Sequence, residues 1–314
     1  MVWVMLSRDE DLQFREQVFA WLRARQLRDQ FVTRDDLSAF QFGGRSVRLI
    51  GTMTGIWKPT GLSDAAIGIW SAYRPEGKQR PYEDSIGDDG FLRYKYRKED
   101  PNSSDNRALR AAMNSGLPLV LYQAIGYAPG SKTQVAKPIF PVYLIGEEPQ
   151  FHQFVVAHET SQHLISSSEP APVLEIAKSY NERIAKVRYH QPLFRARVIH
   201  AYGERCAICR LPFAQLLDAA HIKADSEGGP ARVSNGLSLC KIHHGAYDAN
   251  ILGISADYVV HVKESVLDTF DGPTLQHSIK EMNGESLRQI PAEKASRPDR
   301  EFLAERFERF LEAS

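Results

Sequence analysis

The chain has 314 residues, a length that predicts about two domains, and its 43% hydrophobic content is enough for ordinary globular cores. Lys and Arg number 39, as do Asp and Glu, so the overall charge does not indicate a polyanionic partner, and such a partner would have to meet a local patch. No apolar run reaches the ~18 residues of a membrane span and no signal-peptide pattern opens the chain, so we expect a soluble, cytoplasmic protein without membrane contact.

The first expected element is an amphipathic helix over residues 9–28. Ser7 and Glu10 fit a capping box at its start. Apolar residues recur along it at helical spacing, namely Leu12, Phe14, Val18, Trp21 and Leu22.

Residues 31–157 differ in character, because short β-prone runs alternate with Gly, Pro and Asp turns. The runs cover residues 46–53, 65–70, 91–96, 117–127 and 139–146. Many short strands favour a compact β-barrel or sandwich over a parallel βαβ sheet. One intervening helix is expected over residues 105–115, ending at Gly116.

Aromatic and basic residues are interleaved in this region. Aromatic rings beside cations suit stacking on a base and pairing with phosphates. Alternate aromatics of FLRYKY fit a core face with solvated cations equally well, and acidic residues are as numerous as basic ones between residues 74 and 107. The aromatics concerned are Trp57, Trp70, Tyr73, Tyr82, Tyr94 and Tyr96.

A polar, Ser/Pro-rich stretch over residues 158–172 is the best candidate for a linker. It would separate a domain over residues 1–157 from a second over residues 173–314. The second domain should open with one or two helices over residues 173–202. Further expected elements are two strands within 251–255 and 258–267 and a closing amphipathic helix that starts after Asp299.

All three cysteines lie in the second domain, in two short pairs of soft donors. Cys206-x2-Cys209 and Cys240-x2-His243 together offer the four ligands that a structural zinc ion takes, and a C-x2-C pair presents two thiolates from one tight turn. Three cysteines in a chain of this length argue against a disulfide scaffold. Two alternatives stay open: a redox C-x2-C motif, although nothing thioredoxin-like surrounds it, and ordinary core cysteines.

The insertion between the two pairs carries a second set of polar residues. We expect a strand over residues 216–222, a turn-rich loop over 226–236 and a helical segment over 237–251.

These residues suggest a reaction centre. His244 and Asp248 are four apart on the expected helix, so they share a face and can hold one divalent ion. His221, at the end of the strand, can take a proton from water while the metal neutralises charge on a phosphate. Asn235 can brace the loop by hydrogen bonding.

The segment resembles the HNH endonucleases of the ββα-metal fold. The resemblance runs through AAHI, the Gly-Gly turn, SNGLSLC and the HH pair and ends with YDANILGI, while QPLFRARVIHAYGERCAIC resembles members found in restriction enzymes. It covers residues 188–255. It implies that His221 is the general base, Asn235 the middle residue of the signature and His244 a metal ligand, with Asp248 where some relatives place a second helix ligand. The expected cofactors are a structural Zn²⁺ and a catalytic Mg²⁺ or Mn²⁺.

The chain departs from many relatives at the residue before the base, where they carry an Asp or His ligand and this chain has Ala220. Asp218 is the candidate replacement. Asp218 lies two residues before that position on the same side of the strand. Because a strand advances ~3.3 Å per residue, Asp218 should lie roughly 6–7 Å short of the place that the ligand before the base occupies, unless the strand bulges.

Basic residues outnumber acidic ones between residues 182 and 253, which favours local contact with DNA phosphates. Such contacts would position a duplex without selecting a sequence, and each cation also fits an ordinary solvated surface. The candidates are Arg195, Arg197, Arg205, Lys223, Arg232 and Lys241.

Restriction-type HNH proteins commonly join a β-barrel of the SRA or PUA-like class, which flips a modified base into an aromatic pocket. Residues 1–157 are similar to that class in general character, and DDGFLRYKY resembles the tyrosine–aspartate–glycine stretches of SRA domains. A flipped base needs stacking and hydrogen bonds to its Watson–Crick edge. The candidate pocket residues are Trp57, Tyr73, Tyr94 and an acid, Asp88 or Asp89.

The sequence thus predicts a two-domain α+β protein, with a β-barrel-like recognition module followed by a zinc-stapled ββα-metal nuclease. The expected function is modification-dependent restriction of double-stranded DNA, with modified cytosine as the mark and a homodimer supplying one site per strand. Two alternatives stay open: a DNA-binding or regulatory protein with a degenerate HNH domain, for which Ala220 argues, and an HNH nuclease directed by a partner protein.

Overall fold

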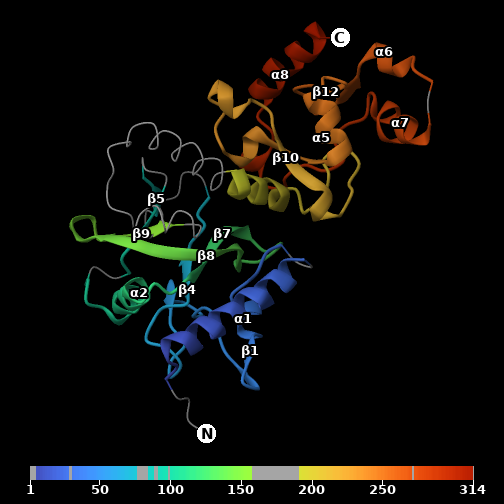
Figure 1. Cartoon of the computed structure of the whole chain (residues 1–314). Coiled ribbons are helices and arrows are strands. Elements are labelled where there is room, and N and C mark those ends of the chain that lie inside the picture. Colours follow the sequence, from blue (N-terminus) through green and yellow to red (C-terminus); the bar gives the residue numbers. More distant parts are fainter. Residues whose placement is uncertain are drawn as a thin grey trace, which may run out of the picture. The chain divides into compact units, whose positions relative to one another are not determined.

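The structure is a computed structural model, and it describes residues 5–27, 30–75, 84–87, 91–97, 100–157, 191–270 and 272–313. The chain divides into two compact units, unit 1 (Met1–Tyr189) and unit 2 (His190–Ser314) (Figure 1). The expected linker and the beginning of the helical region after it lie outside the described residues. Within the described ranges, no helix combines the length and the apolar character that a membrane span needs.

Helix α1 (Arg8–Gln26) confirms the first expected element. Ser7 Oγ accepts a hydrogen bond from the Glu10 amide, and the Glu10 carboxylate accepts one from the Ser7 amide at 2.8 Å, so the capping box is formed. Phe14, Val18 and Leu22 are fully buried in one core cluster with residues of the neighbouring sheet. The apolar stripe read from the sequence therefore marks the packed face of the helix.

A buried arginine joins α1 to two other segments of unit 1. Arg15 is fully buried, and its Nε donates to Asp11 Oδ1 at 2.7 Å. Its Nη1 donates to the carbonyls of Ala66 at 2.8 Å and Pro118 at 2.6 Å. Burial lowers the pKa of Arg15, while the charge of Asp11 opposes that shift. A buried charge is tolerated when its hydrogen bonds are satisfied in this way, and the arrangement ties the helix to the segments it bonds.

Seven strands of unit 1 form one sheet in the order β3-β4-β7-β8-β9-β6-β5. Strands β4 and β7 run parallel, and the other neighbours run antiparallel. The edge strands β3 and β5 are not paired with each other in the described residues, so the sheet is not shown closed into the expected barrel. The bounds are β3 (Ile56–Trp57), β4 (Gly68–Ser71), β5 (Ser85–Ile86), β6 (Leu92–Lys95), β7 (Leu119–Tyr127), β8 (Gln134–Glu148) and β9 (Gln153–Ala157), with a separate ribbon of β1 (Gln41–Phe42) and β2 (Arg45–Ser46).

Strand β8 links the two halves of this sheet (Figure 1). Its first part, from Gln134 to Val142, pairs with β7, and its last part, from Tyr143 to Glu148, pairs with β9. The register shifts within both pairings, which bends a strand and increases its local twist. Alternate residues of β7 belong to two different apolar clusters, Val120 and Tyr122 to one and Leu119 and Leu121 to the other, so the sheet buries a cluster on each face.

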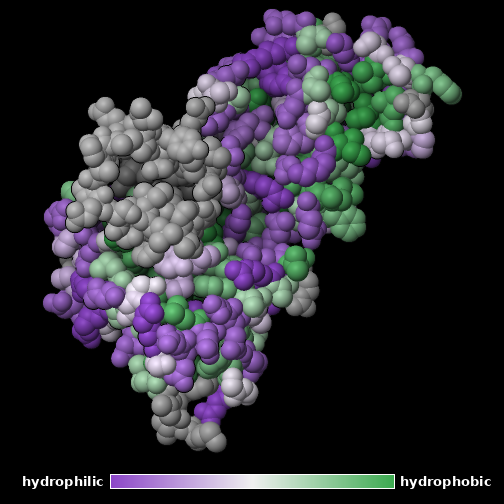
Figure 2. Space-filling view, in the orientation of Figure 1, coloured by the Kyte–Doolittle hydropathy of each residue, from purple (hydrophilic) through white to green (hydrophobic). Residues whose placement is uncertain are grey.

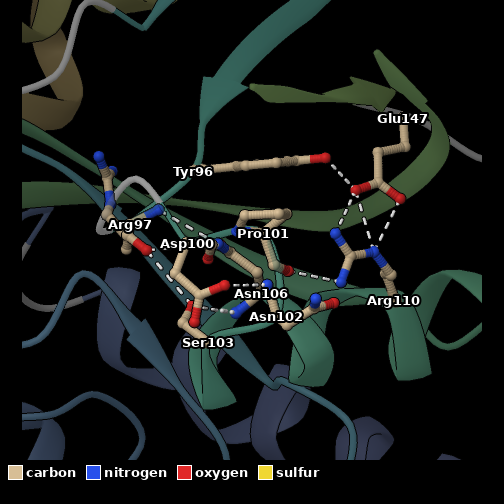
Figure 3. Close-up of polar contacts among 9 residues, drawn as sticks. All are labelled: Tyr96, Arg97, Asp100, Pro101, Asn102, Ser103, Asn106, Arg110 and Glu147. Carbon is tan, nitrogen blue, oxygen red and sulfur yellow. Dashed lines mark hydrogen bonds and ion pairs between the residues drawn. The ribbon is translucent and has the colours of Figure 1, made fainter. Parts of the chain in front are cut away.

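Helix α2 (Ser104–Asn114) confirms the second expected helix, and Gly116 follows it with a φ of +61°. A polar network fixes it to β8, as Figure 3 shows. Arg110 donates to both carboxylate oxygens of Glu147, which also accepts a hydrogen bond from the Tyr96 hydroxyl. The hydrogen bonds from Arg110 hold the pKa of Glu147 below its ordinary value, although burial opposes the shift. Tyr96, one of the interleaved aromatics, therefore takes part in an ion-pair network within unit 1.

Unit 2 contains a helical segment over residues 191–201, an antiparallel hairpin, a short helix, a second strand pair and a C-terminal helix. The hairpin strands are β10 (Leu217–His221) and β11 (Gly236–Cys240), and the later elements are α5 (Lys241–Asp248), β12 (Leu252–Ile254), β13 (Val260–Val262), α6 (Glu264–Leu267), α7 (Pro273–Ser278) and α8 (Arg300–Glu312). Single 3₁₀ turns are η1 (Asp36–Ser38) and η2 (Pro149–Phe151) in unit 1, and η3 (Ala214–Leu216), η4 (Asp225–Glu227), η5 (Val233–Asn235), η6 (Lys280–Met282) and η7 (Lys294–Ser296) in unit 2.

The C-terminal helix is docked onto the second strand pair, as the sequence predicts. Asp299 caps α8 by accepting from the amide of Glu301 at 3.0 Å. Phe310 is almost fully buried and lies so close to Gly253 of β12 that a Cβ at Gly253 would approach its ring to 2.5 Å. Glycine at this position is what lets α8 approach β12.

Three sequence predictions about secondary structure are wrong. Residues 264–267, expected to continue a strand, form the short helix α6. The run over residues 46–53 is almost entirely loop, since only Ser46 belongs to a strand. The segment over 237–240 was expected to begin a helix, but it forms β11, and α5 starts at Lys241. Leu237 and Leu239 are fully buried in the hairpin, and this packing determines the conformation of a run that is too short for its periodicity to be diagnostic.

Candidate active site and metal centre

The β10–β11 hairpin places every candidate residue of unit 2. Leu217 pairs with Cys240 at one end, and His221 pairs with Gly236 at the other, with no register shift between them. Helix α5 follows β11 directly, so its first turn lies beside the start of β10. The β10, β11 and α5 elements thus form a ββα unit, with Cys240 at one end of the hairpin and His221 at the other.

The four predicted zinc ligands lie together. One ligand atom from each of Cys206, Cys209, Cys240 and His243 falls within 4.8 Å of all the others, and they are the only such group of three or more potential ligands among the described residues. Cys206 Sγ is 3.5 Å from His243 Nδ1, and Cys240 Sγ is 3.1 Å from it. A tetrahedral zinc ion with Zn–S of about 2.3 Å and Zn–N of about 2.0–2.1 Å separates such atoms by roughly 3.5 Å. The cluster therefore fits a zinc ion.

His243 is oriented by a backbone carbonyl. Its Nε2 lies 2.7 Å from the carbonyl oxygen of Ser278, at the end of α7, and can donate a proton to it. With that proton on Nε2, Nδ1 presents its lone pair to the cysteine sulfurs, as a metal-binding imidazole requires. The metal centre would therefore also hold α7 against the hairpin.

His221 is half-buried and stacked on an aromatic ring. The rings of His221 and Phe194 are 4.1 Å apart between centroids and inclined by 15°. Burial lowers the pKa of His221, Asp225 opposes that shift and His244 adds to it. The neutral imidazole, the form that can accept a proton, is therefore favoured at neutral pH.

Asn235 braces the loop between the two hairpin strands, the role predicted for it. It is fully buried, and its Oδ1 accepts from the Lys223 amide at 2.9 Å. Its Nδ2 donates to the carbonyl of Lys223 at 2.9 Å and to that of Pro230 at 3.0 Å. All three contacts are to backbone, so Asn235 fixes the chain just after His221.

His244 lies between two carboxylates on opposite sides of its ring. Its Nδ1 is 3.6 Å from Asp218 Oδ2, and its Nε2 is 3.3 Å from Asp248 Oδ2. Because the two ring nitrogens point away from each other, one ion on His244 can take only one of these carboxylates in this arrangement. The other is then placed to accept the remaining N–H, as is usual for metal-bound imidazole.

Asp218 is the better ordered of the two carboxylates. Arg195 Nε donates to its Oδ1 at 3.1 Å, and Lys241 Nζ donates to its Oδ2. Burial would raise the pKa of Asp218, but the hydrogen bonds from Lys241 and Arg195 outweigh it, so the pKa lies below its ordinary value. Asp218 has 24% of its side chain exposed and Asp248 has 65%. Asp218 is therefore charged and held in place.

Asp218 lies beside His244. The β10–β11 pairing has no register shift, and the first turn of α5 lies beside the start of β10, so Asp218 Oδ2 comes within 3.6 Å of His244 Nδ1. The expected offset of Asp218 from the ligand position at residue 220 stays a prediction. Ala220, two residues after Asp218 on the same face of β10, is fully buried in the core cluster of unit 2.

The cations predicted to contact DNA are engaged within unit 2. Lys223 Nζ lies 3.1 Å from Glu305 Oε2, and Arg232 Nη2 lies 2.8 Å from Asp299 Oδ2. Both cations also lie over the ring of Phe302, at 5.5 and 5.3 Å from its centroid. A phosphate would have to compete with α8 for them.

Two further basic candidates, Arg195 and Arg197, are partly buried. The Nε of Arg197 is buried. Arg195 bonds Asp218 and the backbone carbonyls of Ala214 and Leu217.

The aromatic residues proposed for a base pocket in unit 1 occupy different environments. Tyr94 is fully buried, and its hydroxyl donates to the Gly55 carbonyl at 2.8 Å, so its ring belongs to the core. Trp57 is half-buried and donates to the Arg48 carbonyl at 2.9 Å. Tyr73 is half-buried and lies edge-on to Tyr127. Asp88 and Asp89 lie outside the described residues.

The surface near the site combines these charges with exposed apolar side chains. On unit 2, apolar residues gather over the region of α5 and α7 (Figure 2). Phe213, Leu216 and Ile242 are each about half exposed. Ile242 lies two residues before His244 in the chain. His244, which lies between Asp218 and Asp248, thus has an exposed apolar residue, Ile242, beside it on α5.

Comparisons with known proteins identify the C-terminal unit. Residues 206–255 match the model of a family described as HNH endonuclease. The chain therefore carries a C-terminal HNH domain, and the resemblance inferred from the sequence is confirmed. No curated protein matches the chain.

Two solved structures align with the chain at low similarity. A "Modification dependent TagI restriction endonuclease" has 18% identity and a TM-score of 0.27, covering 82% of this chain and 86% of that one. The "Type IV phosphorothioation-dependent restriction endonuclease ScoMcrA" has 12% identity and a TM-score of 0.22, covering 62% of this chain and 48% of that one. Both TM-scores are below 0.5, so we draw nothing about this chain from these two proteins.

The sequence did not indicate three contacts that shape the site. Phe194 under His221 and Ser278 on His243 come from segments outside the hairpin. Lys241 was noted as a surface cation, but its bond to Asp218 depends on the hairpin register. The only available signal was the position of Phe194 and Arg195 in the upstream stretch that resembles restriction enzymes.

The adjacent histidines provide a matched test of the metal centre. We expect His243→Ala to lose bound zinc and to lower the free energy of unfolding of unit 2 by about 5 kcal/mol or more, since zinc contributes ~10–16 kcal/mol in zinc-finger peptides. His244→Ala should keep the zinc and the stability. Zinc content by elemental analysis and thermal unfolding of both variants check this. Equal zinc content in the two variants would contradict the assignment.

Proposed function

We propose that the chain is a metal-dependent DNA endonuclease whose reaction centre is the hairpin and helix of unit 2. The observation that supports this most strongly is the arrangement of His221, Asn235 and His244 in a ββα unit, within the segment that matches the HNH endonuclease family. In this arrangement a proton acceptor and a candidate metal ligand lie on neighbouring elements braced by a buried amide.

His221 would act as the general base. Burial keeps its imidazole neutral, so it can take a proton from a water molecule that attacks the phosphorus. Asn235 fixes the backbone that follows His221, which limits movement of the base away from the attacking water. When bound, a divalent ion of the Mg²⁺ or Mn²⁺ class would neutralise charge on the phosphate and on the leaving oxygen.

The ion would be held by His244 with one carboxylate. We propose Asp218 as that carboxylate, because it is ordered, charged and aimed at His244 Nδ1. Asp248 would then accept the N–H of Nε2 and keep the ring oriented. Lys241, which donates to Asp218 Oδ2, would lie beside the carboxylate that holds the ion.

A DNA-binding or regulatory protein with a degenerate HNH domain is a competing proposal, for which Ala220 argues. The contact of the Asp218 carboxylate with His244 supports the nuclease instead.

Unit 1 is the candidate for choosing the target. It is a separate compact unit with its own cores, and a nuclease without a recognition module would cut indiscriminately. We propose that it acts as an SRA- or PUA-like recognition module for double-stranded DNA carrying modified cytosine. Cleavage of both strands by a single-site nuclease would require a homodimer. An HNH nuclease directed by a partner protein is the competing proposal.

We expect His221→Ala to reduce cleavage of susceptible DNA by at least about 100-fold, because a positioned general base contributes 10²–10⁴-fold. Folding and DNA binding should be unchanged, since the side chain is only half-buried. Nicking and linearisation of plasmid with Mg²⁺ or Mn²⁺, compared with wild type, measures the effect. Cleavage at the wild-type rate would rule out His221 as the base.

Asp218→Asn and Asp248→Asn form a second matched pair. We expect Asp218→Asn to lower the cleavage rate by about 100-fold or more and Asp248→Asn by about 10-fold, at the low end of the 10–100-fold that orienting partners typically contribute, because Asp248 is mostly exposed. Cleavage rates over a range of Mn²⁺ concentration distinguish the variants. The reverse order would make Asp248 the metal ligand.

The recognition proposal is tested with DNA that differs only in modification. Purified full-length protein should cleave cytosine-methylated or hydroxymethylated duplex at least about 10-fold faster than the unmodified duplex of the same sequence, as expected if the mark contributes more than about 1.4 kcal/mol. Equal cleavage of all three would refute modification dependence. If the purified protein cleaves none of these duplexes and added cell extract restores cleavage, a directing partner protein is favoured.

A further inference from the structure

The helical segment over residues 191–201 lies outside the matched family segment, yet two of its residues touch two different parts of the reaction centre. Phe194 stacks on His221, and the next residue, Arg195, bonds Asp218. Adjacent positions of one helix thus meet the proposed base and the proposed metal ligand.

The stack between Phe194 and His221 is tightly constrained. Phe194 has only 4% of its surface exposed, and the ring separation of 4.1 Å with an inclination of 15° leaves no room for another group between the rings. His221 pairs across the hairpin with Gly236, where a Cβ would come within 2.9 Å of Phe194 Cζ and 2.4 Å of Val198 Cγ2. The residue opposite His221 must therefore be small for the helix to reach the imidazole.

Arg195 is anchored by the backbone as well as by Asp218. Its Nη2 donates to the carbonyls of Ala214 at 3.0 Å and Leu217 at 2.5 Å, while its Nε donates to Asp218 Oδ1 at 3.1 Å. The planar guanidinium is thus held at two carbonyls that flank the start of β10, and it fixes one carboxylate oxygen. The other oxygen, Oδ2, is the one that faces His244.

We propose that Phe194 and Arg195 are positioning residues of the reaction centre, the first holding the plane of the His221 ring and the second holding the Asp218 carboxylate. The proposal rests on the proposed function, since it assigns these residues to the same reaction. It replaces a DNA-contact role for Arg195, because the head group is committed to Asp218 and to the backbone.

The two roles predict different kinetics. A phosphate contact contributes to DNA affinity, so its loss raises the Kd and lowers the salt dependence of binding by about one counterion. A positioning residue acts after binding, so its loss lowers kcat and leaves Kd and the salt dependence unchanged. Misplacement of a reacting group by about 1 Å costs on the order of 100-fold in rate.

The test for Phe194 compares Phe194→Leu with Val198→Ala in the full-length protein. Leucine keeps the site apolar but removes the ring, whereas Val198 is fully buried one turn along the same helix, contacts the same glycine position and does not stack on His221. We expect Phe194→Leu to lower kcat by about 10- to 100-fold with unchanged KM, and Val198→Ala to lower it by less than about threefold. Thermal unfolding of both variants controls for loss of structure.

A spectroscopic measurement makes the test independent of cleavage. The Cε1–H proton resonance of His221, assigned from its absence in His221→Ala, lies in the ring current of Phe194 and should move downfield in Phe194→Leu but not in Val198→Ala. An unmoved resonance, or a kcat for Phe194→Leu within about threefold of that for Val198→Ala, overturns the role of Phe194. If His221→Ala itself cleaves like wild type, the proposed function fails and the catalytic role of Phe194 fails with it, whereas an unmoved resonance removes the positioning role alone.

The test for Arg195 uses Arg195→Lys and Arg195→Gln. Both lose the fork that holds Asp218, so both should lose about 10-fold or more in kcat. Placed in a His221→Ala background that prevents cleavage, both should bind duplex with the Kd and the salt dependence of His221→Ala alone, measured by fluorescence anisotropy. A raised Kd for Arg195→Gln with a shallower salt dependence, and binding retained by Arg195→Lys, would make Arg195 a phosphate contact and overturn the proposal.

Discussion

The pairing of β10 with β11 is the constraint on which the rest of unit 2 depends. Leu217 opposite Cys240 brings the second ligand pair next to the first and starts α5 beside Asp218, while His221 opposite Gly236 leaves space for Phe194. Side chains alternate along a strand, so a slip of one residue would turn every one of these groups to the other face. Asn235 and the cysteine cluster act at the two ends of this hairpin and resist such a slip.

The surroundings of the hairpin are also tied to it by charge. Lys223 and Arg232 of the loop pair with Glu305 and Asp299, and Arg309 of α8 pairs with Glu227. Exposed pairs of this kind contribute little individually. Here they act together with the burial of Leu303 and Phe310, so the loop between His221 and Asn235 is held by α8, whose Glu305 lies 82 residues after Lys223 in the chain.

The sequence predicts best the features that depend on neighbours in the chain. The capping box at Ser7, the end of α2 at Gly116 and the cap at Asp299 are local, and all three are found. The two ligand pairs were recognisable because each C-x2-C or C-x2-H spacing is itself a local geometry.

Features that depend on register or on distant packing could not be predicted. The strand over 236–240 was taken for helix because five residues do not show a period, and its conformation comes from burial of Leu237 and Leu239. The contact of Asp218 with His244 could not be predicted because it depends on which residues pair across the hairpin. The mixed sheet of unit 1 has its one parallel pairing between β4 and β7, strands separated by more than forty residues, which no local pattern could reveal.

The docking of α8 has a consequence for where the catalytic module begins and ends. The family signature ends at residue 255, but α8 seats Phe310 on Gly253 and supplies the acids that neutralise the loop cations, and the segment over 191–201 supports both His221 and Asp218. A fragment limited to the signature would expose the apolar side of β12 and leave Lys223 and Arg232 without their counter-charges. The smallest transferable nuclease module of this chain therefore extends at least from residue 191 to residue 312, more than twice the length of the recognisable motif.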